Sequence, residues 1–151
     1  MTRFAPLLTL LLFATVPASA APELTAEAVN AASGDAPGAL LRAQVLLERA
    51  RFSPGQIDGG AGSNTSRAIA GFQRARGLEP TGQLDQATWQ ALERDAAPAL
   101  VAYTLVAADV AGPFRKIPDD MMAQAKLDSL GFASVEEAVG EKFHVSPKLL
   151  A

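Results

Sequence analysis

One internal repeat constrains this sequence more than any other feature. Residues 58–69 (DGGAGSNTSRAI) align without a gap to residues 81–92 (TGQLDQATWQAL), at an offset of 23 positions. The alignment places Gly59 on Gly82 and Thr65 on Thr88. In each copy a glycine is followed by polar residues and then by apolar residues at helical spacing, which is the pattern of a tight turn leading into a helix. The repeat therefore predicts two copies of one turn-and-helix unit.

Three helices are predicted around the repeat, over residues 39–52, 65–76 and 86–95. Apolar residues recur in the first two at intervals of three and four positions, so one face of each helix can be buried. The predicted inward residues are Leu40, Ala43, Leu46, Leu47 and Ala50 in the first helix, and Ala68, Ile69, Phe72 and Ala75 in the second.

Residues that begin and end these helices can also be predicted. Ser63 or Asn64 is expected to cap the middle helix, and Asp85 the last one. Gly77 is expected to end the middle helix. Leu84 and Trp89 have the spacing of a hydrophobic staple, which predicts that Trp89 is packed rather than ligand-bound.

The N-terminus has the pattern of an export signal. A basic start, a short apolar run and the small residues ASA at positions 18–20 predict a signal peptide over residues 1–20, cleaved after Ala20, with an N-terminal anchor helix as the alternative. Cleavage would leave no stable membrane anchor and would place the protein in the periplasm. Residues 21–38 are interpreted as a leader or linker with one short helix.

Composition excludes several functions. The net charge of −3 does not fit a nucleic-acid-binding protein. The chain has no cysteine and a single histidine, His144, so neither a thiolate nucleophile nor a multi-histidine metal site can be built from it. The loop at Asp58 lacks the spaced carboxylates of a calcium site. We therefore expect no catalytic residue, no metal and no cofactor, and we interpret the protein as a non-enzyme.

Residues 39–97 resemble the three-helix peptidoglycan-binding domain, type 1. The family pattern, G-x-x-D-G-x-x-G-x-x-T followed by A-x-x-x-F-Q, G-L and G-x-x-x-x-x-T, is matched over almost sixty residues. The matching positions are Gln44, Leu47, Gly55, Asp58, Gly59, Gly62, Thr65, Ala68, Phe72, Gln73, Gly77, Leu78, Gly82 and Thr88. The second repeat has Asp85 where the family often has a glycine.

The remaining residues, 98–151, resemble an incomplete LysM module. Residues 103–110 (YTLVAADV) alternate like a short strand, and residues 134–150 are typical of two short helices joined at His144, the first cued by Ser134 and Glu137. A LysM module usually closes with a second strand, and the chain stops at Ala151 before one. The predicted fold is thus mainly α, with a compact three-helix domain and an incomplete α+β segment.

The order of these parts is similar to the N-terminal part of an L,D-transpeptidase, without its catalytic domain. Three functions remain open: non-catalytic binding of cell-wall peptidoglycan, the targeting part of such a transpeptidase, and docking of another envelope protein such as a cell-wall enzyme. The predicted ligand residues are Asp58, Ser63, Asn64, Arg67, Gln73 and Arg76. The residues predicted to be structural are Gly59, Gly62, Thr65, Phe72, Gly77, Gly82 and Thr88.

Overall fold

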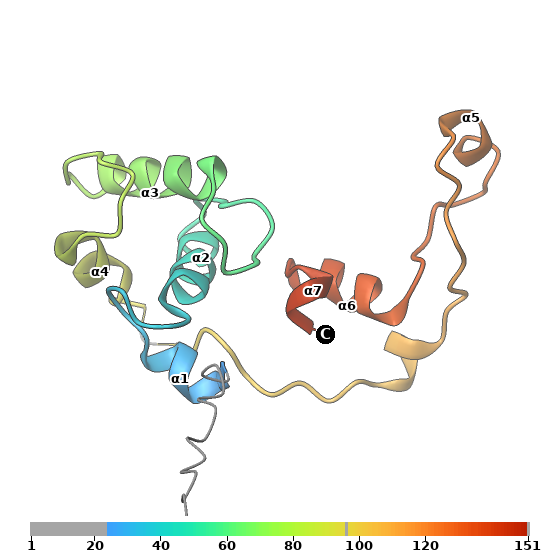
Figure 1. The fold of residues 1–151 in the computed structure, drawn as a ribbon, viewed down its shortest axis with the longest axis horizontal. Helices are drawn as coiled ribbons and strands as arrows, with labels where there is room; N and C mark the ends of the chain where they lie inside the picture. Colours follow the sequence, from blue (N-terminus) through green and yellow to red (C-terminus); the bar gives the residue numbers. More distant parts are fainter. Residues whose placement is uncertain (1–23, 96, 151) are drawn as a thin grey trace, which may run out of the picture.

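The computed structural model describes residues 24–95 and 97–150, so the predicted signal peptide lies outside the described residues. The described chain is mainly helical, as predicted, with four helices in its first part and three short helices and a 3₁₀ turn in its second (Figure 1). The elements are α1 (Ala26–Ala31), α2 (Ala39–Arg49), α3 (Ser63–Ala75), α4 (Gln86–Leu92), η1 (Ala107–Val110), α5 (Met121–Gln124), α6 (Val135–Phe143) and α7 (Pro147–Leu150).

The three predicted helices of the first part are confirmed, with different ends. Helices α2 and α4 each stop three residues before the predicted end, whereas α3 begins two residues before its predicted start and stops one residue early. Helix α2 stops at Arg49 because Arg51 adopts a left-handed backbone conformation, with φ 67°. The Phe52 N–H then bonds back to Leu47 O at 2.9 Å, and the Arg51 N–H to Glu48 O at 2.9 Å. These two bonds form a Schellman motif, which closes the helix three residues before the predicted end.

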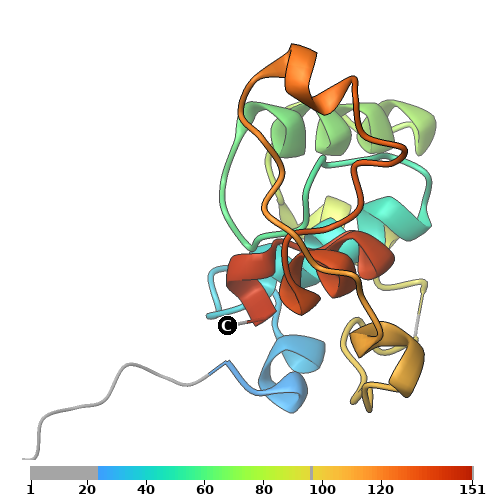
Figure 2. The ribbon, with the colours of Figure 1, turned by 90° about the vertical axis from the view of Figure 1, so that its right-hand side faces the viewer.

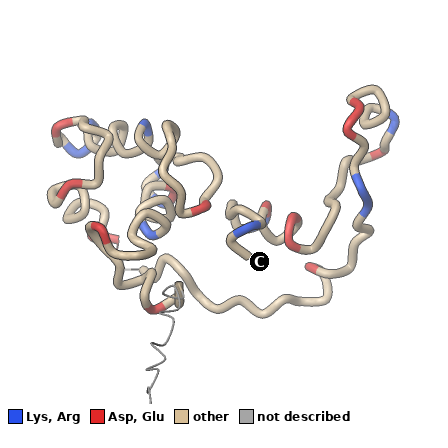
Figure 3. Tube along the Cα trace, viewed as in Figure 1, with Lys and Arg blue, Asp and Glu red and all other residues tan. Residues whose placement is uncertain are grey.

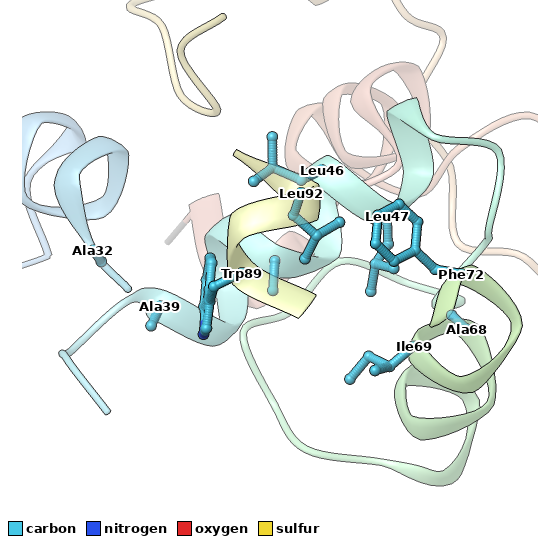
Figure 4. Packing of buried hydrophobic residues seen from close by; sticks show 10 residues of the cluster. Ala32, Ala39, Leu46, Leu47, Ala68, Ile69, Phe72, Trp89 and Leu92 are labelled. Carbon is cyan, nitrogen blue, oxygen red and sulfur yellow. The ribbon is translucent and has the colours of Figure 1, made fainter. Parts of the chain in front are cut away.

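The main core lies between α2, α3 and α4 (Figure 4). Phe72 is 1% exposed and meets the ring of Phe52 edge to face at a centroid distance of 5.7 Å. Trp89 is buried in this core, as predicted, and the partly buried Leu84 packs against the same cluster. Ala75 is exposed rather than inward, because it lies in the last turn of α3 beyond the core.

A second, smaller cluster joins α1 to the rest. Val29 of α1 packs with Leu41 of α2 and Ile57 of the first turn, and Val145 and Leu149 of the C-terminal segment contact the same cluster. The short helix expected within residues 21–38 is therefore present, and its Val29 side chain is fully buried. Leu41 was missing from the predicted inward face because it faces this second cluster.

The C-terminal segment differs from the prediction in one respect. No strand forms over residues 103–110: the chain is irregular up to Val106 and then makes the 3₁₀ turn η1. A strand requires a neighbouring strand for its backbone groups, and no such neighbour lies beside these residues in the described chain. The alternating pattern is thus present without the sheet that it predicted.

The two predicted C-terminal helices are confirmed as α6 and α7. Ser134 caps α6 by accepting a hydrogen bond from Glu137 N–H at 3.2 Å. His144 lies at the junction, as predicted, in the left-handed conformation with φ 57°. Figure 2 shows α6 and α7 lying over the α2 side of the first part. Across the described residues, no helix combines the length and apolar character that a membrane span needs.

Candidate ligand site at the start of helix α3

The first turn of the repeat is held by a buried glutamine of α2. The side-chain Oε1 of Gln44 accepts hydrogen bonds from Asp58 N at 3.1 Å and Gly59 N at 2.8 Å. Its Nε2 lies 3.0 Å from Gly60 O and 3.3 Å from Thr65 Oγ1. One fully buried amide thus fixes both the turn and the first part of α3.

The second turn is held in the same way by Gln73 of α3. Its Oε1 accepts from Gly82 N at 2.9 Å. Its Nε2 lies 3.0 Å from Thr81 Oγ1, 2.9 Å from Gln83 O and 2.9 Å from Thr88 Oγ1. The internal repeat is therefore also a repeat of hydrogen bonding, in which each helix braces the turn that follows it.

This arrangement corrects the prediction that Gln73 binds ligand. Its side chain is fully buried, and both ends of its amide are occupied within the protein. The sequence contains a signal for this role, because Gln73 follows Ile69 by four residues and so lies on the inward face of α3. A glutamine on an apolar stripe favours a buried structural amide over a surface contact.

The start of α3 is open, in contrast to the start of α4. Helix α3 begins after Gly62, which offers no side-chain cap, whereas Asp85 caps α4 by accepting from Thr88 N at 2.8 Å. The prediction that Ser63 or Asn64 caps α3 is wrong, because both lie inside the first helical turn. The first amides of α3 therefore have no capping side chain, and they carry the partial positive charge of a helix N-terminus.

Three of the predicted ligand residues gather at this end. Ser63, Asn64 and Arg67 are all exposed in the first turns of α3, and Arg67 Nη1 lies 3.4 Å from Asn64 Oδ1. Asn64 also lies close to Gly55, where a Cβ would come within 3.3 Å of its Nδ2. Asn64 thus lies between Arg67 of α3 and the loop at Gly55.

The surface of α3 has a single sign of charge. Helix α3 contains arginines but no acidic residue, as Figure 3 shows along its length. Arg76 is exposed just after the far end of α3, with its guanidinium 5.2 Å from the centre of the Phe72 ring. Twelve residues separate Asn64 from Arg76, about 18 Å along a helix. The predicted ligand set therefore divides, with Arg76 far from the N-terminal group.

Asp58 borders the open end of α3 and is mostly engaged in its own turn. Its Oδ1 accepts from Gly60 N at 2.7 Å and from Gln44 Nε2 at 3.1 Å. These hydrogen bonds, first the one from Gly60, hold the pKa of Asp58 below its ordinary value. Asp58 is thus a carboxylate at neutral pH, and it can accept hydrogen bonds from a ligand but repels a ligand's carboxylate.

The residues predicted to be structural have identifiable positions. Gly59 and Gly82 both have positive φ, 71° and 70°, and a Cβ on Gly82 would lie 3.0 Å from Ser66 O on the α3 backbone. Thr65 and Thr88 are buried beside their bracing glutamines. Gly62 precedes α3, Phe72 fills the core, and Gly77 follows the end of α3 with φ 69°.

No cluster of metal-ligating side chains occurs within residues 24–95 and 97–150. His144 Nδ1 lies 3.7 Å from Glu48 Oε1 and its side chain is largely exposed. The backbone N–H of His144 donates to Glu141 O, and this hydrogen bond closes the end of α6. His144 therefore has a role in joining two helices, with the Glu48 carboxylate as its nearest charged neighbour.

The fold and the braced turns define a small helical module with an open, positively polarised helix end. Residues 38–92, which span α2 to α4, match the family model of the putative peptidoglycan binding domain. This part of the chain is thus similar to a family whose name states general peptidoglycan binding. No curated protein matches the chain.

Proposed function

We propose that this chain is an exported, non-catalytic protein of the periplasm that binds cell-wall peptidoglycan at the start of helix α3. The observation that carries the proposal is the uncapped end of α3, fixed by Gln44 within a domain that matches the family model. Export rests on the predicted signal peptide, and the absence of catalysis rests on the sequence composition.

The chemistry of the ligand fits this surface. Peptidoglycan stem peptides carry free carboxylates, and an open helix N-terminus binds carboxylates through its unpaired N–H groups. Arg67 can add a charge-assisted hydrogen bond, and Asn64 and Ser63 can bond to amide or hydroxyl groups of the polymer. Asp58, on the other side of the turn, suits a donor such as a stem-peptide amide. We leave Gln73 out of this site and keep Arg76 as a separate, distant contact.

Co-sedimentation with purified sacculi tests the proposal directly. The protein without its signal peptide is expected to pellet with sacculi and to leave their muropeptide profile unchanged. A protein that stays in the supernatant would overturn the binding proposal. A new cleaved or cross-linked muropeptide would overturn the non-catalytic part alone.

A matched pair of variants locates the site. The change Asn64→Ala with Arg67→Ala removes one amide and one guanidinium from the open end of α3. The control, Gln90→Ala with Arg74→Ala, removes the same groups from exposed positions elsewhere. We expect only the first pair to weaken sedimentation, with both melting temperatures unchanged. Equal binding by the two variants would place the site elsewhere on the domain.

A second candidate function is that of the N-terminal targeting part of an L,D-transpeptidase. It is favoured by the contact between the two parts of the chain, since the Ser146 N–H donates to Ile57 O at 2.7 Å and Ile57 N–H to His144 O at 3.2 Å. A fixed C-terminal segment suits a module that presents another domain. The test is whether the encoding reading frame, or its neighbour, continues into a domain with a cysteine and a histidine.

The chain could instead dock a cell-wall enzyme or another envelope protein, as the sequence left open. Parallel pull-downs with sacculi and with envelope protein extract separate this function from wall binding. Retention on the extract alone would favour docking, and retention on sacculi alone would favour the proposal above.

A further inference from the structure

The segment between the two parts of the chain has a free backbone edge. Residues 101–105 are extended and exposed, and Figure 1 shows them as a stretch running from the region of α1 towards η1. Among the described residues, no hydrogen bond involves the backbone groups of residues 101–105. A row of unpaired N–H and C=O groups on an extended chain is a template for pairing with another strand.

Both ends of this segment are fixed. At one end, Asn30 clamps Leu100: its Nδ2 donates to Leu100 O and its Oδ1 accepts from Leu100 N, each at 2.8 Å. At the other end, the Val106 N–H donates to Asp109 Oδ2 at 2.9 Å. The hydroxyl of Tyr103 also donates to Asp109 Oδ2, at 2.7 Å. The segment is thus held extended before any partner arrives, which lowers the entropic cost of pairing.

The side chains suit pairing of the segment with itself. Residues 99–108 (ALVAYTLVAA) contain no charge, no proline and no glycine, so the segment itself brings no like charges together. The charged groups at the Tyr103 hydroxyl, Lys142 and Asp109, form an ion pair at 2.8 Å within each copy. Val101, Tyr103 and Leu105 occupy alternate positions and are 74%, 44% and 49% exposed. Alternate residues of an extended chain share one face. An antiparallel pair centred on Tyr103 therefore sets Val101 of each chain opposite Leu105 of the other.

We propose that two copies of this chain associate through antiparallel pairing of residues 101–105, in the register that places the two Tyr103 residues opposite each other. Each copy supplies the strand that the other lacks, so the contact is two-fold symmetric. On one face, Val101 of each chain packs against Leu105 of the other, while the Tyr103 ring keeps its contact with Phe143 of α6, at a centroid distance of 4.8 Å. This inference is independent of the proposed ligand site at α3.

The association is expected to be weak. Two strands of five residues bury far less than the roughly 1,200 Å² of a stable interface. A two-stranded sheet without further support is also marginally stable in water. The dimer should therefore form at high protein concentration, as occurs when many copies are confined to one compartment or surface.

Sedimentation equilibrium of the chain without its signal peptide tests the proposal. We expect the average mass to rise towards that of two chains as concentration increases. Changing Val101→Lys with Leu105→Lys places like charges opposite each other and should weaken association at least about tenfold. The control, Met121→Lys with Met122→Lys, adds the same charges at apolar positions that are 80% and 71% exposed, and it should associate like the parent. A parent that is monomeric up to about 1 mM, or a strand variant that associates like the parent, would overturn the proposal.

Engineered cysteines test the register, because the chain has none of its own. In the proposed pairing, Ala102 of one chain is directly opposite Thr104 of the other, within the Cα distance that a disulfide spans. Oxidation of a mixture of Ala102→Cys and Thr104→Cys proteins should thus give mainly the mixed dimer. The two residues 102 of a dimer, and likewise the two residues 104, are too far apart to crosslink efficiently. Equal amounts of mixed and unmixed dimers would contradict this register.

Discussion

The change Gln73→Met separates the bracing role of this residue from the ligand role that its sequence position predicted. Methionine has a similar length and volume, so the core around Thr88 stays filled while the amide is removed. The variant loses the acceptor for Gly82 N and the donors to Thr88 Oγ1 and Gln83 O. The structural cost of the change is therefore almost purely one of hydrogen bonding.

The magnitude follows from the groups that lose their partner. A typical intramolecular hydrogen bond contributes about 1 kcal/mol, and a buried group left unsatisfied costs about 1–3 kcal/mol. Thr88 is fully buried but keeps its bond to Asp85 Oδ1, at 2.7 Å, and Gly82 is half-buried, so part of the loss is recovered by water. We expect the free energy of unfolding to fall by about 2–4 kcal/mol, which lowers the melting temperature by roughly 10 °C or more in a domain of this size.

Urea unfolding followed by tryptophan fluorescence measures this change, because the single tryptophan, Trp89, is 5% exposed in the main core. The control is Gln90→Met, the same substitution at an exposed position of α4, which should change stability by less than about 0.5 kcal/mol. The bracing argument is refuted if Gln73→Met is as stable as this control. Loss of sacculus binding at unchanged stability would instead restore the ligand role.

Three further results are expected. Phe72→Ala should cost about 3–5 kcal/mol of stability, since the ring is almost fully buried, and an unchanged urea midpoint would remove Phe72 from the core. Arg51→Gly should stabilise the protein by about 1 kcal/mol, because glycine adopts the left-handed conformation without strain, and a lower melting temperature would contradict this. The Lys142 ammonium holds the pKa of Asp109 at about 2, below the ordinary value of 3.8. Because protonation of Asp109 removes the ion pair, the contact between η1 and α6 should persist above pH 4 and be lost as pH falls towards 2. Near-ultraviolet circular dichroism of the single tyrosine follows this transition, and Asp109→Asn should abolish it.

Much of the helical part could be predicted because helices are encoded by neighbours in the sequence. The spacing of apolar residues indicated α2, α3 and α4. Asp85 indicated the start of α4, and Gly77 indicated the end of α3. The internal repeat indicated that Gly59 and Gly82 share one turn geometry, and their φ angles agree to within one degree. These features depend on contacts over a few residues, so the local sequence is sufficient.

The candidate site was only partly predictable. Exposure of Asn64 and Arg67 follows from their place off the apolar stripe, but Gln73 has the same polar chemistry and is buried. Residue type alone does not distinguish a surface amide from a buried one, because the difference depends on whether a distant turn supplies partners. The missing cap of α3 was not predicted, because the helix begins at Ser63 and Gly62, which has no side chain, takes the cap position.

The sequence by itself thus determined the helices, the repeated turns and the apolar faces that must be buried. The tertiary structure decided how these elements are used. Gln44 and Gln73 brace the turns, and Ile57 joins the C-terminal helices through Ser146. Within the part of the chain that the structure describes, residues 101–105 have no neighbouring strand. An alternating pattern gives a chain its preference for an extended shape, but a strand forms only where a second chain segment satisfies its backbone. That second segment is distant in the sequence, so the local sequence does not predict whether it will lie beside the first.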